Sequence, residues 1–113
     1  MAKKVLWFSR HEMTDAQKAA LGDVTINQVN RSIQSAFELQ EEIDEADIIA
    51  IVAPIQLQQQ FLKLAGEKPV IMAVNDRLLV PQPDGTEDKV EFRFVKWERL
   101  IKIEVVKEDY KPE

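Results

Sequence analysis

Four segments rich in apolar residues recur along the first two thirds of the chain, at 4–8, 24–29, 48–53 and 69–74. Three of them are continuous apolar runs, which is typical of strands buried on both faces of a sheet. The segment 24–29 is less apolar and more typical of an edge strand. Segments with helical spacing of apolar residues separate the four. The order βαβαβαβ predicts parallel strands joined by right-handed crossovers.

The first predicted helix has clear signals at both ends. Thr14 with Gln17 three residues later matches a capping box, and Gly22 suits the position that ends a helix. We expect this helix to pack on the sheet through a face of small residues, namely Ala16, Ala19, Ala20 and Leu21.

The other two predicted helices are amphipathic. Ser32 or Ser35 opens the second, which has an acidic, solvated side and an apolar side. Its apolar positions are Ile33, Ala36, Phe37, Leu39, Ile43 and Ala46. The third covers about 55–65 and ends at Gly66. Its glutamines at 58–60 are expected to face solvent or a partner.

The last third of the chain changes character. Two short apolar segments, 78–80 and 90–94, flank a Pro-Asp-Gly loop at 83–85 and predict an antiparallel hairpin. A frayed tail is expected at 107–113. A final strand before it is indicated by three apolar residues that alternate with charged ones, Ile101, Ile103 and Val105. Residues 1–113 are therefore expected to form one Rossmann-like, three-layer α/β domain. Its sheet is mostly parallel and is followed by a C-terminal antiparallel hairpin or strand.

Composition narrows the possible functions. Of 113 residues, 45% are hydrophobic and 31% charged, which indicates a folded core rather than disorder. The chain has no cysteine, which excludes disulfides and thiolate metal sites and favours a cytoplasmic location. No apolar stretch approaches the roughly 20 residues of a membrane helix, so we expect no membrane partner. The net charge of −5 argues against binding duplex nucleic acid but permits a local pocket for a small anion.

Polar side chains gather where the predicted strands end. Ligands of open parallel sheets bind beyond the carboxyl ends of the strands, and helix N-termini favour anions there. Two arginines among these residues add positive charge, so we expect a phosphate-sized pocket. The candidate residues are Ser9, Arg10, His11, Thr14, Pro54, Gln56, Asn75 and Arg77.

Most of these residues also have a purely structural interpretation. Ser9 can satisfy nearby backbone groups, and Thr14 can act only as a helix cap. Both arginines can form surface ion pairs of small energetic consequence, Arg10 with Glu12 and Arg77 with Asp76.

We expect neither a cofactor nor a metal ion at this site. The single histidine, His11, has no suitably spaced carboxylate or histidine partner. No G-x-G-x-x-G, P-loop or G-x-S-x-G motif is present. The sequence therefore does not support binding of a dinucleotide, binding of a nucleoside triphosphate at a P-loop, or α/β-hydrolase activity.

The residues around the end of the first predicted strand, 6–17, form a pattern that resembles a known family. The sequence Leu6-Trp7-Phe8-Ser9-x-His11-x-Met13-Thr14-x-x-Gln17 resembles the opening of small stand-alone proteins of CRISPR loci that have CARF-like, Rossmann-type folds. Some of these are ring nucleases, which degrade cyclic oligoadenylate messengers of antiviral defence. The strand that leads into Ala53-Pro54-Ile55-Gln56-Leu57 is similar in outline.

The resemblance implies a metal-independent phosphodiesterase that acts as a homodimer and binds the cyclic RNA across the two-fold axis. The ribose 2′-hydroxyl of the substrate attacks its own phosphate in line, and the protein supplies positioning and charge. Ser9 and Gln56 would hold ribose or phosphate, Arg10 or Arg77 would neutralise charge, and His11 would assist proton transfer.

A non-catalytic module that senses a nucleotide or contacts another protein is the alternative. The lack of a second acid or base beside His11 and the glutamine-rich third helix favour it. A homodimer is expected under either interpretation, because three aromatic residues alternate with polar ones on strands that can be exposed: Phe92, Phe94 and Trp97.

Overall fold

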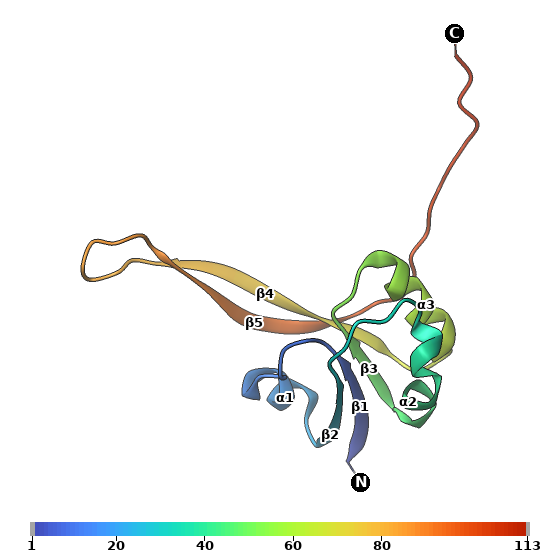
Figure 1. Cartoon of the computed structure of the whole chain (residues 1–113), viewed down its shortest axis with the longest axis horizontal. Helices are drawn as coiled ribbons and strands as arrows, with labels where there is room; N and C mark the ends of the chain where they lie inside the picture. Colours follow the sequence, from blue (N-terminus) through green and yellow to red (C-terminus); the bar gives the residue numbers. More distant parts are fainter. Residues whose placement is uncertain (1, 113) are drawn as a thin grey trace.

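The computed structural model describes residues 2–112 (Figure 1). Its elements in chain order are β1 (Lys3–Phe8), α1 (Asp15–Leu21), β2 (Val24–Val29), the 3₁₀ helix η1 (Ala36–Leu39), α2 (Gln40–Glu45), β3 (Ile48–Ile51), α3 (Ile55–Ala65), β4 (Val70–Val80) and β5 (Lys89–Arg99). None of the helices in the described part of the chain is long and apolar enough to cross a membrane.

The five strands form one sheet in the order β2-β1-β3-β4-β5. β1 pairs in parallel with both β2 and β3, and β3 pairs in parallel with β4. β5 is antiparallel to β4. The expected mixed α/β architecture, a mostly parallel sheet followed by an antiparallel pair, is therefore confirmed. β2 lies on one side of β1, whereas β3, β4 and β5 follow on its other side. The order in which successive strands join the sheet therefore reverses at the β1–β3 pair.

Helices cover the sheet on both faces (Figure 1). Alternate residues of β1 point to opposite sides, as strand geometry requires. Leu6 and Phe8 join the core beneath η1, α2 and α3, where the ring of Phe8 lies 5.5 Å from that of Phe61. Val5 and Trp7 join a smaller core on the side of α1. Trp7 is 2% exposed and meets Trp97 of β5 edge to face at 5.9 Å, so the two indoles pack together on this face of the sheet.

The first helix is capped as predicted but packs differently. Thr14 Oγ1 accepts from Gln17 N, Gln17 Oε1 accepts from Thr14 N, and Gly22 ends the helix. The expected alanine face is wrong: Ala16, Ala19 and Ala20 are exposed, and Gln17 is the buried residue. The cause is the indole of Trp97, which donates to Gln17 O at 3.0 Å and so brings that side of the helix against β5.

The second helix begins at Ser35 rather than Ser32. Ser35 caps η1, and α2 follows directly. The prediction that Phe37 packs inward is wrong, because its side chain is 59% exposed. A 3₁₀ helix has three residues per turn, so Ala36 and Leu39 share the buried side and Phe37 points away.

The third helix matches its predicted bounds, but the strands around it do not. β3 ends at Ile51, two residues earlier than expected. β4 continues to Val80, so the strand predicted separately at 78–80 belongs to it. The expectation that strand four ends before Asn75 is also wrong, because each residue from Asn75 to Val80 pairs with β5. Cross-strand pairing thus overrides a local sequence that is typical of a turn.

The hairpin turn is where the sequence placed it, and the predicted final strand is absent. Gly85 takes a positive φ of 78°, and the carboxylate of Asp84 accepts from Thr86 N at 3.1 Å. From Leu100 to Pro112 the structure has no helix or strand, so the strand expected at 101–105 does not form within this chain. The segment instead leaves the sheet and runs away from the hairpin (Figure 1).

Candidate functional site

The turn after β1 is held by polar contacts on its backbone. Ser9 is buried, and its hydroxyl accepts from His11 N at 3.1 Å. The amide of Gln28 on β2 donates to Ser9 O at 3.0 Å and to His11 O at 3.1 Å. The indole of Trp7 also donates to His11 O, at 2.8 Å. These contacts fix the direction of Arg10 and His11, whose side chains are exposed.

A cleft of about 330 Å³ opens on one side of this turn, at the carboxyl ends of β1 and β3. We call it the Arg10 cleft. It combines apolar walls with a few polar groups, as small-molecule sites generally do. Its lining residues are Phe8, Ser9, Arg10, His11, Ser32, Ile33, Val52, Pro54 and Leu57.

Arg10 is held by a hydroxyl and not by a carboxylate. Its Nη2 donates to Ser32 Oγ at 2.7 Å. The surface ion pairs expected of Arg10 with Glu12 and of Arg77 with Asp76 do not form. Across residues 2–112 the ion pairs are Arg31–Glu38 and Lys102–Glu104. The guanidinium group therefore retains donors and its full charge at the mouth of the cleft.

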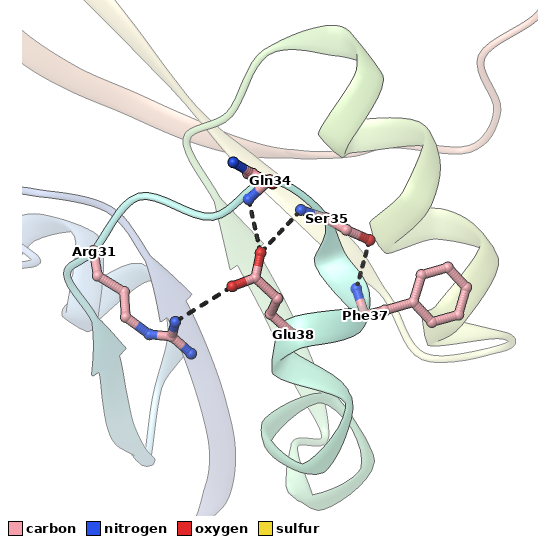
Figure 2. A network of polar contacts seen from close by, with 5 residues as sticks. All are labelled: Arg31, Gln34, Ser35, Phe37 and Glu38. Atoms are coloured by element: carbon pink, nitrogen blue, oxygen red, sulfur yellow. Dashed lines mark hydrogen bonds and ion pairs between the residues drawn. The ribbon is translucent and has the colours of Figure 1, made fainter.

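The loop that carries Ser32 is itself fixed by a carboxylate (Figure 2). Glu38 accepts hydrogen bonds from Gln34 N at 2.7 Å and Ser35 N at 3.2 Å, and its other oxygen lies 3.7 Å from Arg31. The amide of Gln34, followed by that of Ser35, holds the pKa of Glu38 below its usual value. The loop is thereby tied to the start of η1, which keeps Ser32 beside Arg10.

A second cleft, of about 420 Å³, lies on the other side of the same turn. We call it the Phe92 cleft, because this side chain of β5 forms its outer wall. The start of α1 forms the opposite wall. The ladder between β4 and β5 is irregular here, because Val95 of β5 has no partner between the pairs Val74–Lys96 and Asn75–Phe94, and Asn75 lines the cleft. The full lining is Trp7, Ser9, His11, Glu12, Thr14, Gln17, Ile51, Val52, Ala53, Met72, Ala73, Asn75 and Phe92.

The predicted site residues divide between these clefts. Ser9 and His11 line both; Arg10 and Pro54 line the Arg10 cleft; Thr14 and Asn75 line the Phe92 cleft. Two candidates line neither cleft: Gln56, exposed in the first turn of α3, and Arg77, exposed far along β4.

Sequence reasoning missed the residues that support the turn from a distance. Gln28 and Ser32 lie 19 and 22 residues from their partners Ser9 and Arg10, and no local motif links them. A polar residue within β2 and another just after it were the available signals. Of the three glutamines of α3 that were expected to face solvent or a partner, Gln59 is exposed, but Gln58 and Gln60 bond to their own chain. Gln58 donates to Ala53 O at 2.8 Å, and Gln60 Oε1 accepts from Ala36 N at 2.7 Å, so both serve the fold.

No protein-family model matches the chain, and neither a curated protein nor a solved structure matches it at a significant level. The functional argument therefore rests on the residues and geometry of the two clefts.

Proposed function

We propose that this protein binds a small phosphate-bearing ligand of the nucleotide class in the Arg10 cleft. The observation that carries the proposal is Arg10: a guanidinium group oriented by Ser32 Oγ, without a carboxylate partner in the described chain, at the mouth of a cleft of nucleotide-compatible size. Guanidinium groups bind phosphate oxygens through paired, charge-assisted hydrogen bonds.

The apolar walls favour a nucleotide over an inorganic anion. Val52, Pro54 and Ile33 offer apolar surface on which a base can pack, and Ser9 and Ser32 add hydroxyl groups to the same lining.

Strand order supports the position of the site and a Rossmann-like assignment of the fold. The order β2-β1-β3-β4-β5 is that of flavodoxin-like doubly wound sheets, in which ligands bind at the switch point between β1 and β3. The Arg10 cleft is lined by residues that follow these two strands, Ser9 and Val52 among them.

A ring nuclease reaction on cyclic oligoadenylate is the second candidate. The observation that favours it is that His11 and the hydroxyl-bearing Ser9 border both clefts, so a ligand that spans the turn meets both residues. In this reaction the ribose 2′-hydroxyl gives its proton to solvent, O2′ forms a bond to phosphorus, the bond from phosphorus to O5′ breaks, and O5′ gains a proton, which leaves a 2′,3′-cyclic phosphate. His11 would deliver that proton, and Arg10 would stabilise the phosphate charge.

Calorimetric titration with mononucleotides and with cyclic tetra- and hexa-adenylate, in EDTA, tests the binding proposal. We expect saturable binding of at least one of these ligands. Arg10→Gln should weaken it roughly 10- to 100-fold, because a charge-assisted hydrogen bond is lost. Arg99→Gln is the matched control. Arg99 lies opposite Ile71 near the start of β4, donates to Glu67 O, and does not line the Arg10 cleft. Absence of binding, or equal loss in both variants, refutes the proposal.

Product analysis of the same mixtures separates the two candidates. Cleavage of the ring that is lost in His11→Ala, with binding retained, supports the nuclease. Binding that survives His11→Ala, with no cleavage by either protein, supports a non-catalytic sensor.

A further inference from the structure

The chain exposes more surface than a monomer of its mass should. Its accessible area is 8612 Å², whereas folded monomers of 13.0 kDa expose about 6,300 Å². Its radius of gyration is 17.8 Å, against about 13 Å for a compact domain of this length. The excess area, roughly 2,300 Å², exceeds the ~800 Å² that each partner buries in a standard protein–protein interface.

The first source of the excess is the outer half of the β4–β5 hairpin, which we call the arm (residues 75–94). β3 pairs only with Val70 and Ile71 of β4, so the arm is a two-stranded ribbon that leaves the body of the sheet (Figure 1). Such a ribbon alone is at best marginally stable in water. A third strand or a packed face is needed to stabilise it.

One face of the arm is apolar and uncovered. In the ladder, Leu79 lies opposite Val90, and Arg77 lies opposite Phe92, so these four side chains share a face. Phe92 is 74% exposed and Leu79 is 62% exposed. The aromatic ring of Phe94 continues the face towards the core, 5.6 Å from Trp97.

The second source is the C-terminal segment, which we call the tail (residues 101–112). Its residues 101–105 alternate apolar and charged side chains as a strand does, yet the tail pairs with no strand among the described residues. The last backbone hydrogen bond before it runs from Leu100 N to Val70 O. Its exposed apolar side chains are Ile101, Val105, Val106 and Tyr110.

We propose that the missing partner of both segments is a second copy of this chain: the tail of each copy adds as a strand to the free edge of β5 in the arm of the other. The arm and tail leave the body in different directions, so a copy does not cover its own arm (Figure 1). A two-fold axis satisfies both arms and both tails at once.

The side chains of the two strands are complementary. Glu91 and Arg93 lie on the charged face of the arm, and Lys102 and Glu104 alternate in the tail. A register with Lys102 opposite Glu91 places Glu104 opposite Arg93 if the strands are parallel, or opposite Lys89 if they are antiparallel. Opposite charges meet in both cases.

The same register matches the apolar residues. Side chains alternate between faces, so Ile101 and Ile103 then lie on the face of Val90 and Phe92. Because Phe92 also lines the Phe92 cleft, the tail of the second copy borders that cleft.

Light scattering on the eluted full-length protein gives the first test. We expect twice the 13.0 kDa mass of one chain, and a monomer after truncation behind Leu100. If the wild-type protein is a monomer, the proposal is overturned. A dimer that persists without the tail also overturns it.

Charge reversal tests the pairing without the risk of misfolding, because Glu91 and Lys102 are both exposed. Glu91→Lys and Lys102→Glu each create two like-charge contacts per dimer, and each should raise the dimer Kd roughly tenfold. Lys111→Glu, near the end of the tail, is the control that should leave the Kd unchanged.

Mixing the two single variants gives the decisive result. In a heterodimer of Glu91→Lys with Lys102→Glu, both contacts join opposite charges, so the mixture should dimerise as tightly as the wild type. If the tail pairs with its own arm, mixing changes nothing and the proposal fails. The readout is independent of nucleotide binding, so it stands or falls separately from the proposed function.

Discussion

Gln28 is the side chain on which the geometry of the Ser9–His11 turn depends most. Replacing it with leucine keeps most of its volume but removes two donated hydrogen bonds, at 3.0 and 3.1 Å. His11 O keeps the indole of Trp7 as a donor, whereas Ser9 O loses its side-chain donor in a residue that is 5% exposed. A hydrogen bond contributes about 1 kcal/mol net, and a buried acceptor left unpaired costs about 1–3 kcal/mol. We therefore expect Gln28→Leu to lower the free energy of unfolding by about 2 kcal/mol.

Urea unfolding followed by far-ultraviolet circular dichroism measures this loss. For a chain of this length, about 2 kcal/mol should also lower the Tm by roughly 8 °C. Asn27→Ala is the matched control, because Asn27 is the neighbouring exposed amide of β2 and lies on the other face. If the two variants unfold within ~0.5 kcal/mol of each other, Gln28 does not hold the turn and the reasoning is refuted.

Two further predictions concern the surroundings of the clefts. Trp97→Phe keeps an aromatic ring on the sheet but removes the 3.0 Å hydrogen bond to Gln17 O, so it should lower the unfolding free energy by about 1 kcal/mol in urea titration; an unchanged midpoint would contradict this anchoring of β5 to α1. For Glu38, the lowered pKa means that its stabilising contribution is present above the usual value of 4.5 and is lost as the pH falls through the lowered pKa. Wild-type stability should therefore fall more steeply than that of Glu38→Gln as the pH drops below 4.5, and parallel pH profiles would disprove it.

Elements with strong local signals could be predicted from the sequence. The Thr14–Gln17 capping box and the limits of α3 at Pro54 and Gly66 agree with the structure. In both cases the deciding interactions lie within one or two helical turns, so the residues that cause the structure are close together in the chain.

The rest depends on contacts between distant residues. Asn75 and Arg77 look like turn residues, but β5 holds them in a strand through pairs with Phe94 and Phe92. The support of Arg10 by Ser32 arises only once β1 and β2 lie side by side. Periodicity alone predicted an additional strand at 101–105, but the segment pairs with no strand of its own chain.

The site prediction shows the same division. The turn at Ser9, Arg10 and His11 was located correctly at the end of β1, because a strand end can be recognised from the run that precedes it. The sequence could not predict that two clefts flank this turn. The Phe92 cleft depends on the pairing of β4 with β5, including the irregularity at Val95, and on a hairpin whose length the sequence did not indicate.

The central claim is that the Arg10 cleft binds a phosphate-bearing ligand, and the most direct measurement is the affinity of wild-type, Arg10→Gln and Arg99→Gln proteins for the nucleotide and cyclic oligoadenylate panel. The account predicts saturable binding by the wild type and Arg99→Gln, with Arg10→Gln weaker by roughly 10- to 100-fold. Binding that is equal in all three proteins, or absent from all three, would contradict it.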